Sequence, residues 1–373
     1  MTLLSNNSPK KSTFRFRPLL WINYVFIILL LFTQLTPIIA PDTLWPMTIL
    51  ALAFPLLLLI NGLFVILWLI TLKKYLFYSL LAIIFSYSLT LDHFQFRSST
   101  PKVEDKEAIT LFSFNAKNLS NNNFNRADKK IRMQIMSFTA DKSADIVCFQ
   151  EFQSYPTKGI HTVKEFKNQL GMKNSYAMPY LKKSKLKYID LLVLYTNYNI
   201  KNSKDFYMDG KAYGFYVDLE VKGKTIRVFN LHLESNHFNT YDYQIFTEKE
   251  ANLNSEKGHH IVWLLKKIKK YSVKRTHQAR TIKEAIKQSP FPVIVLGDFN
   301  DTPASFIYQH ISENMTDAFK IKGNGYGNTY NGELPPMRID YALFKGDFEI
   351  LNYQVLKPNL SDHYPLLIKF KLK

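Results

Sequence analysis

Cysteine is almost absent from the chain, which has only Cys148 among its 373 residues. A single cysteine excludes an internal disulfide framework, but it leaves the compartment open because secreted proteins can do without disulfides. Acidic residues are scarce at the start: residues 1–91 contain six Lys or Arg and one acid, Asp42. Internal repeats and low-complexity tracts are also lacking, which argues against a repeat architecture. The first 91 residues and the rest of the chain therefore differ in composition, and an average over the whole chain describes neither part.

Positive charge dominates the remainder of the chain. Residues 92–373 hold 42 basic and 29 acidic residues, which leaves +13 of the total formal charge of +18 there. A soluble domain this basic typically binds polyanions such as nucleic acid, anionic lipid headgroups or phosphate-rich substrates. Two basic patches, Lys182–Lys187 and Lys266–Arg275, could follow a phosphate backbone or lie on anionic lipid. The alternative is a lysine-rich surface that only keeps the domain soluble.

Three apolar runs fill the first quarter of the chain. Pro18–Ala40 and Pro46–Leu72 contain no charged residue and exceed the ~20 helical residues that cross a bilayer core of ~30 Å. Tyr75–Leu91 is shorter and includes several Ser, Thr and Tyr residues, but it is still long enough to span. A cleaved signal peptide fits poorly as an alternative, because a second apolar run follows the first within five residues. The pattern predicts about three transmembrane helices.

Basic residues flank these runs unevenly. The first 17 residues hold four Lys or Arg, the loop Pro41–Trp45 holds none, and Lys73 and Lys74 separate the second and third runs. Because short cytoplasmic loops are enriched in Lys and Arg, we expect a multi-pass cell membrane protein whose C-terminal domain lies outside the cytoplasm. If the third run did not span, that domain would face the cytoplasm instead. The expected organisation is a basic cytoplasmic N-terminus (1–17), a transmembrane region (18–91, with spans 18–40, 46–72 and 75–91), a linker (92–108) and a C-terminal domain (109–373).

From Ile109 onward, short β-like runs alternate with stretches of helical periodicity. The helical stretches lie near residues 126–140, 260–271 and 276–288. Many strands with helices between them predict a mixed α/β domain with two sheets or one large sheet. The expected strands are Ile109–Phe114, Ile146–Phe149, Leu191–Tyr195, Phe215–Val221, Thr225–Leu233, Val293–Leu296, Ile339–Phe344 and Pro365–Phe370.

Polar side chains that can bind metal or transfer protons follow several of these strands. Asn115 ends the first strand, and Glu151 closes the second. Alternation along the strand near residues 225–233 puts His232 on one face together with Asn230 and Glu234. Each signal is weak alone, because a Glu after a strand is often a surface residue and a lone His on a strand is usually structural.

The turn that follows the strand Val293–Leu296 is a stronger signal. Asp298, Asn300 and Asp301 lie within four residues at the mouth of a buried strand. There they would repel one another and lose hydration, unless a cation or a reactive proton sat among them. The alternative is a plain turn rich in Asp and Asn.

Two further segments complete the set. Asp340 lies in Arg338-Ile339-Asp340-Tyr341, and His363 lies in Ser361-Asp362-His363 just before the last strand. An Asp next to a His in sequence does not face it directly, so His363 needs an orienting carboxylate from elsewhere. Asp340 is the expected partner.

The order and spacing of these segments resemble the endonuclease/exonuclease/phosphatase superfamily, which includes DNase I-like nucleases, abasic-site endonucleases, sphingomyelinases and inositol-phosphate phosphatases. The resemblance runs from Ile109 to the C-terminus. It rests above all on Gly297-Asp298-Phe299-Asn300 and Ser361-Asp362-His363, with Arg338-Ile339-Asp340-Tyr341 between them. It implies an α+β fold, a two-sheet α/β sandwich of the DNase I-like type, here preceded by about three transmembrane helices.

The resemblance also implies a role for each of these residues. His363 or Asp298 would take the proton from an attacking water, with Asp340 orienting His363. Asn300 would hold a non-bridging oxygen, and His232 would stabilise the transition state or protonate the leaving group. No substrate-binding residue is assigned. The expected metal ligands, for Mg²⁺ or Mn²⁺, are Glu151, Asn115 and Asp362, and the expected catalytic residues are His363, Asp340, Asp298, Asn300 and His232.

The sequence therefore predicts a membrane-anchored, Mg²⁺-dependent phosphoesterase that hydrolyses a phosphodiester, as nucleases do, by in-line attack of water. One alternative is a lipid or sugar-phosphate phosphodiesterase or phosphatase at the membrane surface. Another is a catalytically silent membrane protein that binds a phosphorylated partner. The expected partners are a phosphate-ester substrate, either nucleic acid or phospholipid, and the lipid bilayer, because fold alone does not fix the substrate.

Overall fold

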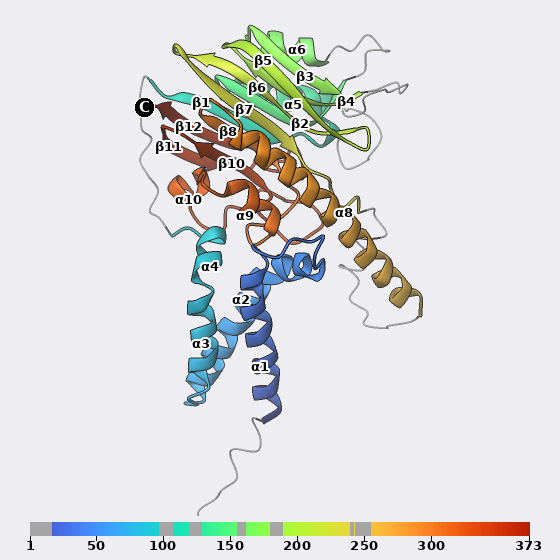
Figure 1. Cartoon of the computed structure of the whole chain (residues 1–373), viewed down its shortest axis with the longest axis vertical. Coiled ribbons are helices and arrows are strands. Elements are labelled where there is room, and N and C mark those ends of the chain that lie inside the picture. The colour runs from blue at the N-terminus through green and yellow to red at the C-terminus, as the bar shows by residue number, and fades with distance from the viewer. Residues whose placement is uncertain are drawn as a thin grey trace, which may run out of the picture.

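Two six-stranded sheets pack face to face in the C-terminal part of the chain (Figure 1). The computed structural model describes residues 17–96, 107–119, 129–154, 162–179, 189–238, 242 and 255–373. The first sheet has the order β11-β12-β1-β2-β4-β3, and the second has the order β5-β6-β7-β8-β10-β9. The expected two-sheet α/β sandwich is therefore confirmed.

Eight of the twelve strands in the described residues overlap the strands expected from the sequence. The first sheet contains β1 (Ile109–Asn115), β2 (Ile146–Ser154), β3 (Asn174–Pro179), β4 (Ile189–Thr196), β11 (Phe348–Val355) and β12 (Leu366–Leu372). The second contains β5 (Asn199–Met208), β6 (Lys211–Val221), β7 (Lys224–His232), β8 (Val293–Asp298), β9 (Thr316–Asp317) and β10 (Asp340–Lys345).

The core lies between the sheets and under the helices on their outer faces. Leu111, Cys148, Val228 and Ile294 are among the side chains packed between the sheets. The outer face of the first sheet is covered by α5 (Lys129–Ala140) and α6 (Thr162–Gln169). The outer face of the second is covered by α8 (Ser255–Lys287) and α9 (Phe306–Ser312), while the short helices η3 (Lys117–Leu119) and α10 (Ala318–Lys322) fill the edges. Strands such as β8 are thus buried on both faces, which explains their unbroken apolar runs.

The N-terminal helices form a separate bundle below the sandwich (Figure 1). Arg17–Leu35, made of α1 (Arg17–Phe32) and η2 (Thr33–Leu35), and α2 (Pro46–Ile70) are long and apolar enough to cross a membrane. The third apolar run forms α3 (Leu76–Phe85) and α4 (Tyr87–His93), bent by 64°. At the bend, the Ser86 hydroxyl donates to the Ala82 carbonyl at 2.9 Å, a contact that bends helices. The third expected span is therefore a broken pair of helices.

Polar contacts join this bundle to the sandwich. The Thr36 hydroxyl donates to the carbonyl of Ala304 at 2.6 Å, and Arg280 of α8 pairs with Asp42 at 2.5 Å. The loop between α1 and α2 therefore lies on the same side of the bundle as the sandwich.

The end of α4 is docked in the same way. Asp92 is buried and accepts from Gln309 Nε2 at 2.7 Å and from Lys320 Nζ at 2.5 Å. Gln95 then pairs with Gly325 through backbone hydrogen bonds. Residues 92–96, expected to be part of a linker, are thus held against the sandwich, and residues 97–106 of that expected linker lie outside the described residues.

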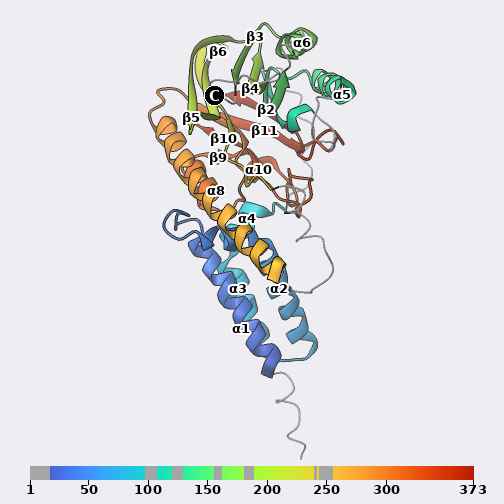
Figure 2. The same cartoon turned by 90° about the vertical axis from the view of Figure 1, so that its right-hand side faces the viewer.

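Two of the expected helices are one. The stretches near 260–271 and 276–288 belong to the single 33-residue helix α8. Neither Gly nor Pro interrupts the residues between them, so nothing ends the helix there. Figure 2 shows α8 running along the flank of the sandwich and down to the level of the N-terminal bundle.

Candidate active site

Strand pairing brings the ends of several strands together at one edge of the sandwich. β1 and β2 are parallel, so Asn115, the last residue of β1, pairs with Gln150, which directly precedes Glu151 in β2. β7 and β8 are also parallel, and their last residues, His232 and Asp298, are paired. β10 is antiparallel to β8, so its first residue, Asp340, also pairs with Asp298. Register alone therefore gathers predicted site residues that are far apart in the sequence.

Asp298 lies at the centre of this group, with 1% of its surface exposed. Its Oδ2 atom accepts a hydrogen bond from Nδ2 of Asn115 at 3.0 Å. The same oxygen lies 3.7 Å from Nε2 of His363 and 3.9 Å from Nε2 of His232. The other oxygen, Oδ1, accepts from the backbone N–H of Asn300 at 2.7 Å. Both sheets thus contribute side chains to one carboxylate.

Glu151 stands beside Asn115 and His232. Asn115 Nδ2 donates to Glu151 Oε1 at 3.1 Å, and that oxygen lies 3.4 Å from Nε2 of His232. Because Asn115 turns its N–H₂ group toward both Glu151 and Asp298, the two carboxylates are the better candidates for metal ligands.

His363 and Asp340 are in contact. His363 Nδ1 lies 2.9 Å from Asp340 Oδ2, and both residues are buried. The Asp340 backbone N–H donates to the Thr329 hydroxyl at 3.0 Å, and the ring of Tyr330 meets the His363 ring edge-on at 5.4 Å. The imidazole is therefore fixed on one side, and its Nε2 atom is directed to the Asp298 side of the group.

Backbone conformation at the site is unusual. Gly297 has φ +125°, and a Cβ there would lie 2.0 Å from the carbonyl oxygen of Leu231, so only glycine fits. Glu151 and Asn300 have φ +46° and +53°, which non-glycine residues seldom adopt. Strained residues of this kind cluster at functional sites, where the surrounding structure holds them.

Burial and neighbouring charges act in opposite directions on the pKa values of Asp298, His363 and His232. Burial raises the pKa of Asp298 to about 6, although His363 opposes that shift. Burial alone would lower the pKa of His363, but Asp340 and Asp298 outweigh it and raise the value to about 10. Burial lowers the pKa of His232, with Asp298 opposing it. The arrangement therefore keeps His363 protonated near pH 7 while His232 stays neutral.

The donor set suits a hard divalent cation. Asp298, Asp340 and His363 each offer a ligand atom, and these atoms lie within 4.8 Å of one another. The Glu151 carboxylate and the Asn115 amide lie next to them. Mg²⁺ and Mn²⁺ prefer carboxylate and amide oxygens and keep several waters, so few protein ligands suffice.

Asp362 has a different environment from the one expected. Its Oδ2 atom pairs with Lys117 Nζ at 2.9 Å, so a lysine already balances its charge. The neighbouring Ser361 hydroxyl donates to the backbone carbonyl of Asn115 at 2.9 Å and so ties this loop to β1. Asn300 donates from Nδ2 to the Leu233 carbonyl at 2.9 Å while it lines the cavity.

Asn230 and Gln150 lie beneath the site and were not predicted to belong to it. Gln150 Nε2 donates to Asn230 Oδ1 at 2.7 Å, and Asn230 Nδ2 donates to the carbonyls of Phe149 and Val193 in the other sheet. These contacts hold the two sheets together under the site. The available signal was a polar side chain next to buried apolar neighbours, since Asn230 lies between Phe229 and Leu231 and Gln150 follows Phe149.

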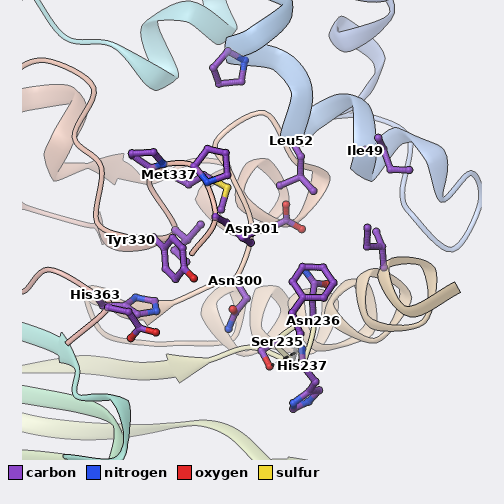
Figure 3. Close-up of a pocket in the computed structure, with 18 of the residues that line it drawn as sticks. Ile49, Leu52, Ser235, Asn236, His237, Asn300, Asp301, Tyr330, Met337 and His363 are labelled. Atoms are coloured by element: carbon purple, nitrogen blue, oxygen red, sulfur yellow. Dashed lines mark hydrogen bonds between the residues drawn. The ribbon is translucent and has the colours of Figure 1, made fainter. Parts of the chain in front are cut away.

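A cavity of about 1230 Å³ opens above this group. Glu151, His232, Asn300 and His363 lie in its wall. Figure 3 shows His363 and Asn300 on one side of the cavity, with Ile49 and Leu52 of α2 on the other. The N-terminal bundle is therefore part of the wall of the candidate active site.

Of the two basic patches, the structure describes only the second, Lys266–Arg275. Lys182–Lys187 lies outside the described residues. In Lys266–Arg275, three of the basic residues are in ion pairs. They are Lys267 with Asp242 (2.8 Å), Lys274 with Asp209 (2.7 Å) and the buried Arg275 with Asp301 (3.3 Å). Much of the second patch is thus already neutralised by acidic side chains.

Comparison with known proteins gives matches for both parts of the chain. The sequence pattern of the Endonuclease/Exonuclease/phosphatase family matches residues 269–363, and a domain of unknown function matches residues 15–93. No protein of curated function matches the chain in sequence.

Solved structures resemble the sandwich. An endonuclease/exonuclease/phosphatase family protein from Bacteroides thetaiotaomicron is 16% identical with a TM-score of 0.52, covering 71% of this chain and 98% of its own. The human Nocturnin catalytic domain with bound sulfate anion is 16% identical with a TM-score of 0.51, covering 73% and 97%. An endonuclease/exonuclease/phosphatase from Beutenbergia cavernae is 13% identical with a TM-score of 0.52, covering 72% of each chain.

The fold, the order of the motifs and the family match agree with one another. The solved structures share the two-sheet sandwich, and the matched residues 269–363 include Asp298, Asn300, Asp340 and His363. The resemblance seen in the sequence is therefore confirmed: residues 269–363 match the Endonuclease/Exonuclease/phosphatase family, and the C-terminal part of the chain has the two-sheet DNase I-like fold of that family's solved members.

Proposed function

We propose that the protein is a membrane-anchored, divalent-metal-dependent phosphoesterase that cleaves its substrate by in-line attack of water on phosphorus. The observation that supports it best is the convergence on Asp298, whose carboxylate lies within 4 Å of Asn115, His232 and His363. Such a group can hold a water, accept its proton and stabilise the charge that develops on the phosphoryl oxygens.

Each side chain has a distinct task in this proposal. Asp298 holds the attacking water and takes its proton, while His363, which Asp340 and Asp298 keep protonated near pH 7, stabilises the negative charge on the phosphoryl oxygens. His232, neutral and facing Glu151 and Asp298, donates a hydrogen bond to the departing oxygen. Glu151 would hold Mg²⁺ or Mn²⁺, and Asn115, whose Nδ2 donates to both Glu151 and Asp298, would keep these carboxylates in place. When bound, the cation neutralises the phosphoryl oxygens as a Lewis acid.

Metal dependence tests this proposal directly. Hydrolysis of a chromogenic phosphodiester by the full chain should vanish in EDTA and return with Mg²⁺ or Mn²⁺. Glu151→Gln should weaken metal affinity by about 10–100-fold, a loss typical for altered metal sites, and high Mg²⁺ should partly restore its rate. Glu165→Gln, an acid on α6 away from the site, is the matched control.

Two results would contradict the proposal. Full activity in EDTA would remove the metal from the mechanism. Absence of hydrolysis with every phosphate ester and every divalent cation would instead favour the silent, phosphate-binding alternative.

We propose further that the sandwich lies outside the cytoplasm. The charge pattern supports this orientation, with basic residues before the first span and at Lys73–Lys74. The docking of Asp42 and Asp92 against the sandwich supports it too, since the first inter-helix loop and the end of α4 then lie on the same side.

Reporter fusions test this topology. Alkaline phosphatase fused after Lys373 should be active, and green fluorescent protein at the same point should be dark. Fusions after Lys74 should give the reverse, because that loop lies at the opposite end of α2. A cytoplasmic signature at Lys373 would mean that α3 and α4 do not cross the bilayer.

Two substrate classes remain as alternatives, a nucleic acid and a lipid phosphate ester. A nucleic acid requires a basic track, and three cations of the Lys266–Arg275 patch are occupied by acids. A lipid phosphate ester requires an apolar wall beside the site, and α2 supplies one. The second feature favours the lipid.

A further inference from the structure

The candidate active site shares its cavity with a candidate membrane-spanning helix. Ile49, Leu52, Leu56 and Leu59 of α2 line it. They recur every three or four residues, so they form one stripe along the helix. The opposite faces of α2, with Phe54, Leu57 and Trp68, are buried within the helical bundle. The stripe is thus the face of α2 that α1 and α3 do not cover, and Leu56 and Leu59 remain 57% and 59% exposed.

A second apolar stripe faces the same cavity from α8. Ile261, Leu264, Leu265 and Ile268 line it with the same helical spacing. Trp263, within the same stretch of α8 but not part of the cavity wall, is 45% exposed. Figure 2 shows α8 descending toward the bundle. The two helices therefore form the sides of an apolar groove, defined here as the α2–α8 groove.

The groove and the site are the two ends of one amphipathic cavity. Carboxylates and imidazoles lie at the sandwich end, whereas residues 46–72 contain no charged residue at all. Figure 3 shows this division, with Ile49 and Leu52 across from His363 and Asn300. A nucleic acid would gain nothing from the apolar end, because its backbone is charged along its whole length.

The size of the groove fits one leaflet of a bilayer. From Ile49 to Leu59 the helix rises by about 15 Å at ~1.5 Å per residue. That is about half of the ~30 Å hydrocarbon core. The groove also begins at the end of α2 next to the sandwich, where a lipid headgroup and its phosphate would lie.

We infer that the substrate is a lipid phosphate ester that enters from the adjacent leaflet, with its phosphate at Asp298 and its hydrocarbon chain in the α2–α8 groove. This inference rests on the proposed phosphoesterase activity and adds the class of substrate and its route. Water attacks phosphorus, the bond from phosphorus to the leaving oxygen breaks, and that oxygen takes the proton. The lipid product stays in the leaflet.

A chain-length series tests the inference in the full protein. The substrates are p-nitrophenyl phosphodiesters that differ only in their alkyl group, from methyl to dodecyl, in detergent micelles with Mg²⁺. We expect kcat/KM to rise by about two- to fourfold for each added methylene, as burial of a methylene predicts, and to level off when the groove is full.

Two variants separate the groove from simple partition into micelles. Leu56→Trp places a bulky ring in the groove, and Leu63→Trp places the same ring at an equally exposed position of α2 (57% against 55%) that does not line the cavity. Leu56→Trp should lower the ratio of dodecyl to methyl kcat/KM by at least about tenfold, which corresponds to losing a few buried methylenes. Leu63→Trp should keep the ratio of the wild type. Leu265→Trp, on the α8 side, repeats the test if Leu56→Trp does not fold.

The outcomes distinguish the inference from the function on which it rests. Hydrolysis of the methyl ester with no dependence on chain length would overturn the lipid inference alone. An equal fall of the ratio in Leu56→Trp and Leu63→Trp would do the same. Absence of hydrolysis for every ester would overturn the proposed phosphoesterase and the lipid inference together.

Discussion

His363→Ala should lower kcat by about 10²–10⁴-fold, the usual effect of removing a positioned acid or base. The imidazole is buried and lies 2.9 Å from Asp340 and 3.7 Å from Asp298, so its removal leaves both carboxylates without the positive group between them. Initial rates with saturating chromogenic phosphodiester and Mg²⁺ give kcat. His277→Ala, which removes an exposed histidine of α8, is the control and should leave kcat unchanged.

The second step of this experiment asks whether His363 and Asp340 act as a unit. If Asp340 works only through the imidazole, the double variant His363→Ala/Asp340→Ala should be little slower than His363→Ala. The coupling is expected because Asp340 Oδ2 occupies Nδ1 of the ring. Fully additive losses would mean that Asp340 acts independently, as a metal ligand or as a structural residue.

The convergence of the site could be predicted because its residues are at strand ends. Asp298 is the last of the six buried residues of β8, and the apolar run before it predicts that strand without any knowledge of the fold. Once β8 lies between β7 and β10, the register brings His232 and Asp340 to Asp298. His363 lies outside these strands, before β12, where a bridge to Tyr330 accompanies its contact with Asp340.

The strands at or near the edges of the sheets could not be predicted in this way. β5 has only one fully buried side chain among its described residues, Phe206, and most of the others are exposed or half-exposed. β11 lies at the edge of the other sheet and is buried only at intervals. Without an apolar face, neither sequence shows the period of two that marks a strand. Pairing with the neighbouring strand stabilises them instead.

No local feature of the sequence predicts that α2 lies in the wall of the site. The apolar run predicts a span, but its orientation depends on contacts between residues that are far apart in the chain. The Thr302 hydroxyl donates to the Ala51 carbonyl at 3.3 Å, and the Thr36 hydroxyl donates to Ala304. The ion pair of Lys117 with Asp362 likewise joins residues that are 245 positions apart. Asp362 was expected to be a metal ligand from its motif alone, and only the fold shows that it has a lysine partner.

Arg338 is the residue whose removal should destabilise the protein most. It was noted in the sequence as part of Arg338-Ile339-Asp340-Tyr341, yet its side chain points away from the site. Nη1 donates to Asp317 Oδ2 at 2.7 Å, Nη2 donates to the backbone carbonyl of Asp92 at 2.8 Å, and the guanidinium lies 4.4 Å from the centre of the Phe319 ring. Only 1% of the arginine is exposed. It thus joins the end of α4 to the sandwich.

Arg338→Met should lower the free energy of unfolding by about 3–5 kcal/mol, because Asp317 would remain buried without its cation. Thermal unfolding of the full chain in detergent measures the loss. Arg132→Met breaks a longer ion pair with the more exposed Glu165 (3.8 Å) and should cost less than about 1 kcal/mol. Arg338→Met/Asp317→Leu should recover part of the loss, since no buried charge is left unpaired. If Arg338→Met were as stable as Arg132→Met, the junction between the bundle and the sandwich would not depend on this arginine. Other contacts would then have to hold α2 in the wall of the cavity.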